Sequence, residues 1–287
     1  SSTDVIEGYT SAAGWAQLGA TSSTAENTDD TATGVKTAIS TTEKIVNQFA
    51  TSSFDSAWYL AITRDEINDE VATSKYSLVH NDSSAFVSQS HIIREGNNTQ
   101  ITVDADVSGG NARLKATGTS VVNSVSFYRI AVGDNTSTST TGNVVVTQNS
   151  DVDSASEVID SFAHASYRGA KYYISINNAS KTEVSSIEAL VVHNGSEAFI
   201  TTYGDINSGS NSLITLTAAI NGSNVEVSAA GNEPNLRVTI YKILLGDSES
   251  ASSGDNVNII GATTVSSTAT TVDSFANTEY TLSLIHI

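Results

Sequence analysis

Apolar and polar residues alternate along most of this chain, as they do in strands that rest one face on a core. The alternation is clearest at residues 101–107, where Ile, Val, Ala and Val are separated by Thr, Asp and Asp. It recurs at residues 214–220. No stretch shows a convincing helical period. We therefore expect an all-β chain.

Further strands are expected where aromatic or β-branched residues cluster between turn residues. They cover residues 57–63, 75–80, 112–116, 125–130, 170–176 and 188–193. Asn194-Gly195 is a strong hairpin signal, and Gly109-Gly110 and Asn221-Gly222 mark other hairpins. About six or seven short strands in each stretch of about 90 residues predict antiparallel β-sandwiches.

The chain repeats itself with a spacing of 113 residues. Residues 46–134 align without a gap on residues 159–247, and 28 of the 89 aligned positions are identical. The segment VHNDSSAF at 79–86 returns as VHNGSEAF, and FYRIAVGD at 127–134 returns as IYKILLGD. A third copy begins at residue 272. Such self-similarity is typical of tandem arrays.

The repeat divides the chain into tandem antiparallel β-sandwich domains joined by Ser/Thr-rich linkers. We predict the end of a preceding repeat plus a linker at 1–45, repeat 1 at 46–134, a linker or exchanged strand at 135–158, repeat 2 at 159–247, a second linker or exchanged strand at 248–271, and the start of a third repeat at 272–287.

Each of the two segments between repeats has a short apolar centre within polar flanks. The centres are Val144-Val145-Val146 in the first segment, and Val257 with Ile259-Ile260 in the second. One interpretation is an extra strand of the same domain, which is favoured because most strands pair locally. The alternative is a strand added to the sheet edge of a neighbouring domain or subunit.

Composition narrows the function classes. With 13 Lys and Arg against 31 Asp and Glu, the net charge is −18, which excludes nucleic acid as a partner. The chain has no Cys, so disulfides and Cys-ligated metals are excluded. No apolar run reaches the length of a membrane span, and we expect a soluble chain without a membrane partner. The absence of Met fits a window on a longer array.

No motif with a known catalytic or cofactor-binding mechanism occurs, so we predict no enzyme, no cofactor and no catalytic, cofactor-binding or metal-binding residues. His80 and His193 occupy equivalent positions before a turn, where a hydrogen-bonding role is favoured over a metal or base role. Asp134 and Asp247 follow Gly at a strand end and fit Asx turns; a structural calcium ion is the less favoured alternative.

Two sets of side chains are candidates for ligand binding. Arg129 and Lys242 share a position in the closing strand, and we expect each stem to pack on the sheet with its charge in solvent. The aromatic residues suggest a sugar-stacking platform, but Trp58 becomes Lys171 in the second copy, so core or interdomain packing is favoured. The aromatic side chains concerned are Trp15, Trp58, Tyr167, Tyr172 and Tyr173.

The order SFAHASYRGAKYYISI, EALVVHNGSEAFITTYGDI, LTAAINGSNVEVSA and LRVTIYKI resembles a repeat of virion structural proteins of tailed phages, especially those of marine cyanobacteria. The resemblance covers nearly all of both full copies. It implies β-sandwich modules in tail, fibre or capsid-surface proteins, with no catalytic residues. Asp55, where the motif has Arg168, is a departure in the first copy.

We therefore expect a non-enzymatic structural protein of a virion exterior, such as a fibre, tail or capsid-decoration component. Its partners would be copies of itself as a homo-oligomer, other virion or filament proteins, and a host-surface glycan. A bacterial extracellular adhesin or filament subunit is the alternative. A carbohydrate-active enzyme would need paired carboxylates in a cleft, which the two copies do not share.

Overall fold

The chain folds into antiparallel β-sheets, and the described residues contain no helix. The computed structural model describes residues 7–10, 14–17, 31–96, 100–120, 122–133, 144–209, 211–246, 252–254, 257–259, 267 and 271. The prediction of an all-β chain with several antiparallel sheets is confirmed. Asp134, Asp247 and residues 272–287, to which sequence predictions also apply, lie outside the described residues.

The strands of the first copy, together with β3 (Thr31–Ile39) before it, form two sheets, which we call the first sheet pair. The other strands are β4 (Lys44–Ala50), β5 (Ser56–Asp65), β6 (Glu70–His80), β7 (Ala85–Arg94), β8 (Ile101–Ser108), β9 (Asn111–Gly118) and β10 (Asn123–Val132). The five-stranded sheet has the order β3-β10-β5-β6-β7, and the three-stranded sheet has the order β4-β9-β8.

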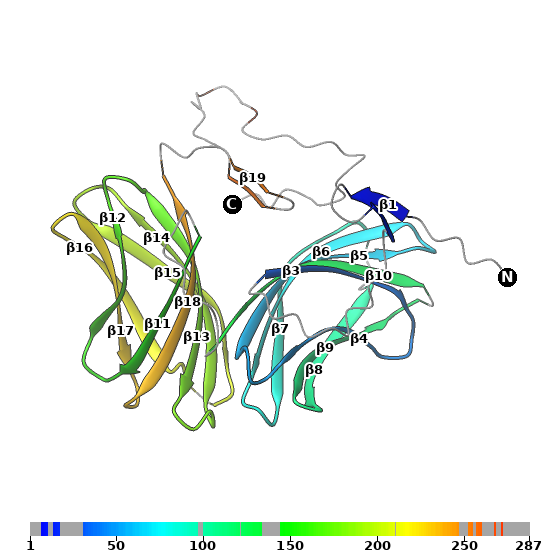
Figure 1. The fold of residues 1–287 in the computed structure, drawn as a ribbon, viewed down its shortest axis with the longest axis horizontal. Coiled ribbons are helices and arrows are strands. Elements are labelled where there is room, and N and C mark those ends of the chain that lie inside the picture. Colours follow the sequence, from blue (N-terminus) through cyan, green and yellow to red (C-terminus); the bar gives the residue numbers. More distant parts are fainter. Residues whose placement is uncertain are drawn as a thin grey trace.

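The strands of the second copy form an equivalent second sheet pair (Figure 1). They are β11 (Val144–Val152), β12 (Glu157–Ala163), β13 (Gly169–Asn178), β14 (Val184–His193), β15 (Ala198–Asn207), β16 (Ile214–Asn221), β17 (Asn224–Gly231) and β18 (Leu236–Leu245). The sheet orders, β11-β18-β13-β14-β15 and β12-β17-β16, repeat those of the first pair strand for strand.

Two short hairpins lie outside the sheet pairs. β1 (Glu7–Thr10) pairs with β2 (Gly14–Gln17), and β19 (Ser252–Gly254) pairs with β20 (Val257–Ile259).

Each sheet pair encloses one apolar core between its two sheets. In the first pair Phe49 and Leu114 from the three-stranded sheet meet Tyr59 and Leu78 from the five-stranded sheet. In the second pair the equivalent cluster joins residues of β12, β16 and β17 to residues of β13, β14 and β18. These residues recur at every second position of their strands, so the predicted alternation is what places them on the core side.

The segments 31–39 and 144–152 are edge strands of the sheet pairs that follow them. The sequence assigns the first to the end of a preceding repeat, but β3 hydrogen-bonds along β10. For residues 135–158, the favoured interpretation is an extra strand of the same domain. It describes β11, which pairs with β18 of its own sheet pair. An edge strand with a polar side and a partner about 90 residues later in the chain resembles a linker in sequence.

Tight turns join the hairpins as their residues predict. Asn194 Oδ1 accepts hydrogen bonds from the backbone N–H groups of Ser196 and Glu197, at 2.9 and 2.8 Å, between β14 and β15. Gly195 has φ +94°, a left-handed conformation that favours glycine. Gly109 and Gly110 likewise join β8 to β9 with positive φ.

Candidate functional site at the junction of the sheet pairs

The outward faces of the two five-stranded sheets pack against each other and form a buried junction (Figure 1). Alternate residues of β5 face the inner core, which leaves Trp58 on the opposite face. Trp58 is 2% exposed, and its ring centroid lies 5.3 Å from that of Tyr173. Around them lie Ile130, Val132, Tyr128, Val146, Tyr241 and Ile243.

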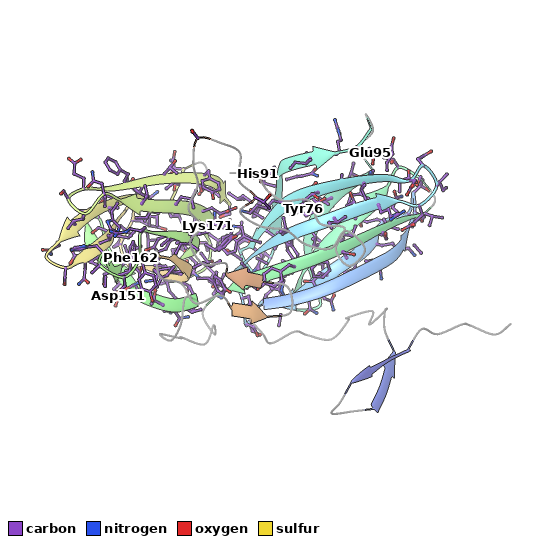
Figure 2. The ribbon with its side chains drawn as sticks, turned by 90° about the horizontal axis from the view of Figure 1, so that it is seen from above. Tyr76, His91, Glu95, Asp151, Phe162 and Lys171 are labelled. Carbon is purple, nitrogen blue, oxygen red and sulfur yellow. The ribbon has the colours of Figure 1, made fainter. Side chains whose placement is uncertain are left out.

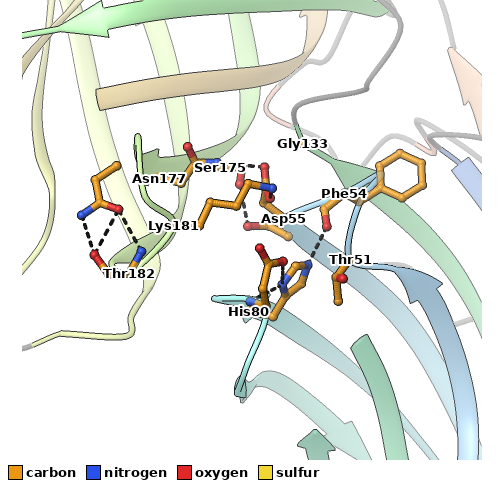
Figure 3. Close-up of polar contacts among 12 residues, drawn as sticks. Thr51, Phe54, Asp55, His80, Gly133, Ser175, Asn177, Lys181 and Thr182 are labelled. Carbon is orange, nitrogen blue, oxygen red and sulfur yellow. Dashed lines mark hydrogen bonds and ion pairs between the residues drawn. The ribbon is translucent and has the colours of Figure 1, made fainter. Parts of the chain in front are cut away.

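A polar contact closes one end of the junction (Figure 3). The carboxylate of Asp55 accepts a hydrogen bond of 2.9 Å from Asn177 Nδ2 and pairs with Lys181 Nζ at 2.6 Å. The hydroxyls of Ser56 and Ser175 are 2.7 Å apart. The side chain of Asp55 is 1% exposed, so this carboxylate is partnered from the other sheet pair at a site that water hardly reaches.

Charged side chains also lie in the junction, Lys171 among them (Figure 2). Glu188, with a side chain 1% exposed, accepts hydrogen bonds from both Lys75 and Lys171. Lys171 also donates to the hydroxyl of Tyr203. Burial and the nearby Lys75 lower the pKa of Lys171 to about 8, although Glu188 opposes the shift. Burial also lowers the pKa of Lys75 and raises that of Tyr203 to about 12.

The junction joins equivalent surfaces of the two copies. Strand β6 faces β14, β7 faces β15 and β10 faces β18, and each of these pairs is separated by 113 residues in the alignment. Lys75 and Glu188 are themselves equivalent positions. Trp58 of the first copy packs against Tyr173 of the second copy. The position equivalent to Tyr173 in the first copy is Leu60, two residues after Trp58. The packing is therefore face to face between equivalent strands of the two copies.

The two equivalent histidines bridge strand ends to a preceding loop. His80 Nε2 lies 2.6 Å from the carbonyl of Phe54, and its Nδ1 accepts a bond of 3.1 Å from the backbone N–H of Asp82. His193 makes the same two bonds, to the carbonyl of Tyr167 and from the N–H of Gly195. These contacts match the structural role favoured from sequence. Burial lowers the pKa of His80.

The prediction for Arg129 is wrong, because this side chain is buried and not directed to solvent. Arg129 is 0% exposed, and its Nη1 donates a hydrogen bond of 3.0 Å to Asn47 Oδ1. Tyr59 donates to the same oxygen at 3.1 Å. The alternation explains the burial, because Val125 and Phe127 on the same side of β10 are core residues.

The prediction for Lys242 is wrong for the same reason. Lys242 is 3% exposed and its Nζ lies 2.8 Å from both carboxylate oxygens of Asp160. Tyr172 donates a hydrogen bond of 2.9 Å to Asp160 Oδ2. Asp160, Tyr172 and Lys242 occupy the positions of Asn47, Tyr59 and Arg129, so each core contains one equivalent polar triad.

The aromatic residues for which core or interdomain packing is predicted divide between different environments. Trp58 and Tyr173 belong to the junction, as interdomain packing requires, whereas Tyr172 lies in the inner core and Tyr167 packs at its margin. The side chain of Trp15 is outside the described residues. His91 is exposed, and its ring lies 6.0 Å from that of Tyr203.

Sequence reasoning noted Asp55 only as a departure from the repeat motif and missed the other polar residues of the junction, namely Lys75, Asn177, Lys181 and Glu188. One signal was available for two of them. The opposite charges of Lys75 and Glu188 stand at equivalent positions of a repeat, where a self-complementary contact would bring them together.

Among the described residues, no group of three or more His, Asp or Glu side chains is placed to hold a metal ion. The same residues include no helix of the length and apolarity needed to cross a bilayer. Comparisons with known protein families, curated proteins and solved structures found no match to this chain.

Proposed function

We propose that this chain is a non-enzymatic structural protein of a virion exterior, a fibre, tail or capsid-decoration component built of tandem antiparallel β-sandwich domains with Ser/Thr-rich linkers. Its partners are copies of itself and other virion or filament proteins, and a host-surface glycan is a further candidate. The resemblance of both copies to virion repeats of tailed phages supports this proposal.

The observation that carries the proposal is the buried junction between two copies of the repeat. Trp58, Tyr173 and Tyr241 form its apolar centre, and Asp55 with Lys181 pairs across its end. A junction of this kind transmits force between modules, because separating the sheets would expose apolar rings and unpair a buried carboxylate. A protein that spaces or reinforces parts of a virion needs such a joint between its modules, whereas an enzyme does not.

Immunogold labelling of native particles tests the proposal. Antibodies against this chain should label the exterior of purified virions, and electron microscopy should place the modules in a regular fibre, tail or surface array. Label confined to filaments on bacterial cells would favour the alternative, an extracellular adhesin or filament subunit. Hydrolysis of a host polysaccharide by the purified chain would overturn the non-enzymatic assignment.

A further inference from the structure

A row of apolar side chains on the outward face of the second five-stranded sheet is exposed. Val192, Phe199 and Leu245 are 54%, 52% and 49% exposed. They are neighbours across β18, β13, β14 and β15, because Leu245 and Val192 both pair with Gly169 and Val192 pairs with Phe199. We call these three residues the acceptor row.

Two of the three equivalent residues of the first sheet pair are fully covered, and the third, Phe86, is partly buried. Val79 and Val132, the counterparts of Val192 and Leu245, are both 0% exposed. Beside this row the end of β13 and the turn that follows it pack from the second sheet pair, and Asn177 and Lys181 reach Asp55 (Figure 3). The first copy therefore shows how these positions are packed when another surface covers them.

An exposed turn of the first sheet pair presents an apolar side chain. The counterpart of the β13–β14 turn is the β5–β6 turn, residues 65–69, which presents Ile67 at 58% exposure. Asp65 Oδ1 accepts hydrogen bonds from the N–H groups of Ile67 and Asn68, at 2.9 and 3.2 Å, so the turn is held in shape. We call residues 65–69 the donor turn.

Charge matches the donor turn to the acceptor row. In the covered row the acidic residue Asp55 receives the cation of Lys181. At the exposed row the equivalent of Asp55 is Arg168, an exposed cation. The surface of the donor turn has the opposite sign, because the exposed carboxylates of Glu66 and Asp69 outnumber Arg64, which pairs with them at 3.5 and 2.5 Å.

We propose that the donor turn of one chain docks on the acceptor row of a second copy, with Ile67 against Val192 and Phe199 and with the carboxylates of Glu66 and Asp69 near Arg168. Within one chain the two surfaces do not cover each other, since Ile67 and the acceptor row remain about half exposed. A contact between two different surfaces of identical chains is heterologous and leaves a free surface at each end. The chains therefore associate head to tail. This inference deepens the proposed function, on which it rests, by naming the self-contact of a structural assembly.

Sedimentation of the full chain and two surface variants tests the contact, at about 0.15 M salt so that the self-repulsion of the acidic chain is screened. Phe199→Asp blocks the acceptor row and Ile67→Asp blocks the donor turn; each should weaken self-association more than about tenfold. Val158→Asp is the matched control, because Val158 is 49% exposed on β12 of the three-stranded sheet and lies in neither surface.

Mixing the two blocked variants gives the decisive result. The Ile67→Asp chain keeps its acceptor row and the Phe199→Asp chain keeps its donor turn, so the mixture should form dimers and stop there. A wild-type chain that stays monomeric up to about 1 mM would overturn the proposal. Continued self-association of Ile67→Asp would also overturn it, because the row would then bind a second row. Neither result depends on whether antibodies label a virion, so failure here is distinguishable from failure of the proposed function.

Discussion

Removing one member of the Lys242–Asp160 pair tests the burial of Lys242, because the sequence predicts its charge in solvent and the structure buries it against Asp160. Both side chains are nearly unexposed, and Nζ contacts both carboxylate oxygens at 2.8 Å. Lys242→Met leaves the Asp160 carboxylate in the core with the Tyr172 hydroxyl as its remaining side-chain partner among the hydrogen bonds described. We expect a loss of about 3–5 kcal/mol in the free energy of unfolding, the usual cost of unpairing a buried charge.

The first copy offers a matched rescue for this experiment. Asn47 and Arg129 occupy the positions of Asp160 and Lys242, so the double variant Asp160→Asn, Lys242→Arg transplants a pair that already works in an equivalent core. We expect the double variant to be more stable than the sum of its two single changes predicts, by about 1 kcal/mol or more.

Calorimetry and urea unfolding followed by circular dichroism measure these changes, with the first sheet pair as an internal reference. Strictly additive single changes would show that the two side chains do not interact. A cost below about 1 kcal/mol for Lys242→Met would show that the carboxylate is solvated, contrary to the burial described.

Three further predictions concern the junction and the strand-end histidine. Burial lowers the pKa of Lys171 from 10.5 to about 8, so the unfolded chain binds more protons between these values and stability should rise with pH across that window; Lys171→Met should flatten the rise in urea titrations. Burial lowers the pKa of His80 below 6.5, so stability should fall as the pH drops below 6.5, and His80→Gln should remove part of the fall in melting curves. Trp58→Ala should cost about 3 kcal/mol at the junction and increase the radius of gyration measured by X-ray scattering, with both sheet pairs still folded.

Each of these three has an outcome that contradicts it. A slope at alkaline pH that is equal with and without Lys171 would show that this amine titrates normally. An acid response unchanged in His80→Gln would mean that other groups cause it. A Trp58→Ala chain with the wild-type radius of gyration would show that polar contacts such as Asp55 with Lys181 hold the junction alone.

Much of the fold could be predicted from local pattern. The alternation at residues 101–107 and 214–220, and the turn residues Asn194-Gly195, indicate strands and hairpins because side-chain direction and turn geometry are local properties. Because the two copies align without a gap, a strand predicted in one copy also predicts the equivalent strand in the other. The pairing of edge strand β3 with β10 could not be predicted in this way, because an edge strand has one partner and that partner is distant in the sequence.

The junction could be predicted only in outline. The unmatched Trp58 and Lys171 indicate a surface that differs between copies, and interdomain packing follows from that. The partners of Asp55 and Glu188 lie in the other copy, so they depend on how two sheets meet in space. Arg129 and Lys242 were assigned to solvent by residue type, although their place on the inward side of the closing strand indicates burial.

The opposite charges of Lys75 and Glu188 give the tandem pair a fixed order. If two identical first copies met through this face, lysine would oppose lysine, and two identical second copies would set glutamate against glutamate. Either arrangement places like charges together away from water, which disfavours it strongly. The unlike pairing of the two copies in this chain is therefore favoured by charge as well as by the segment that links them.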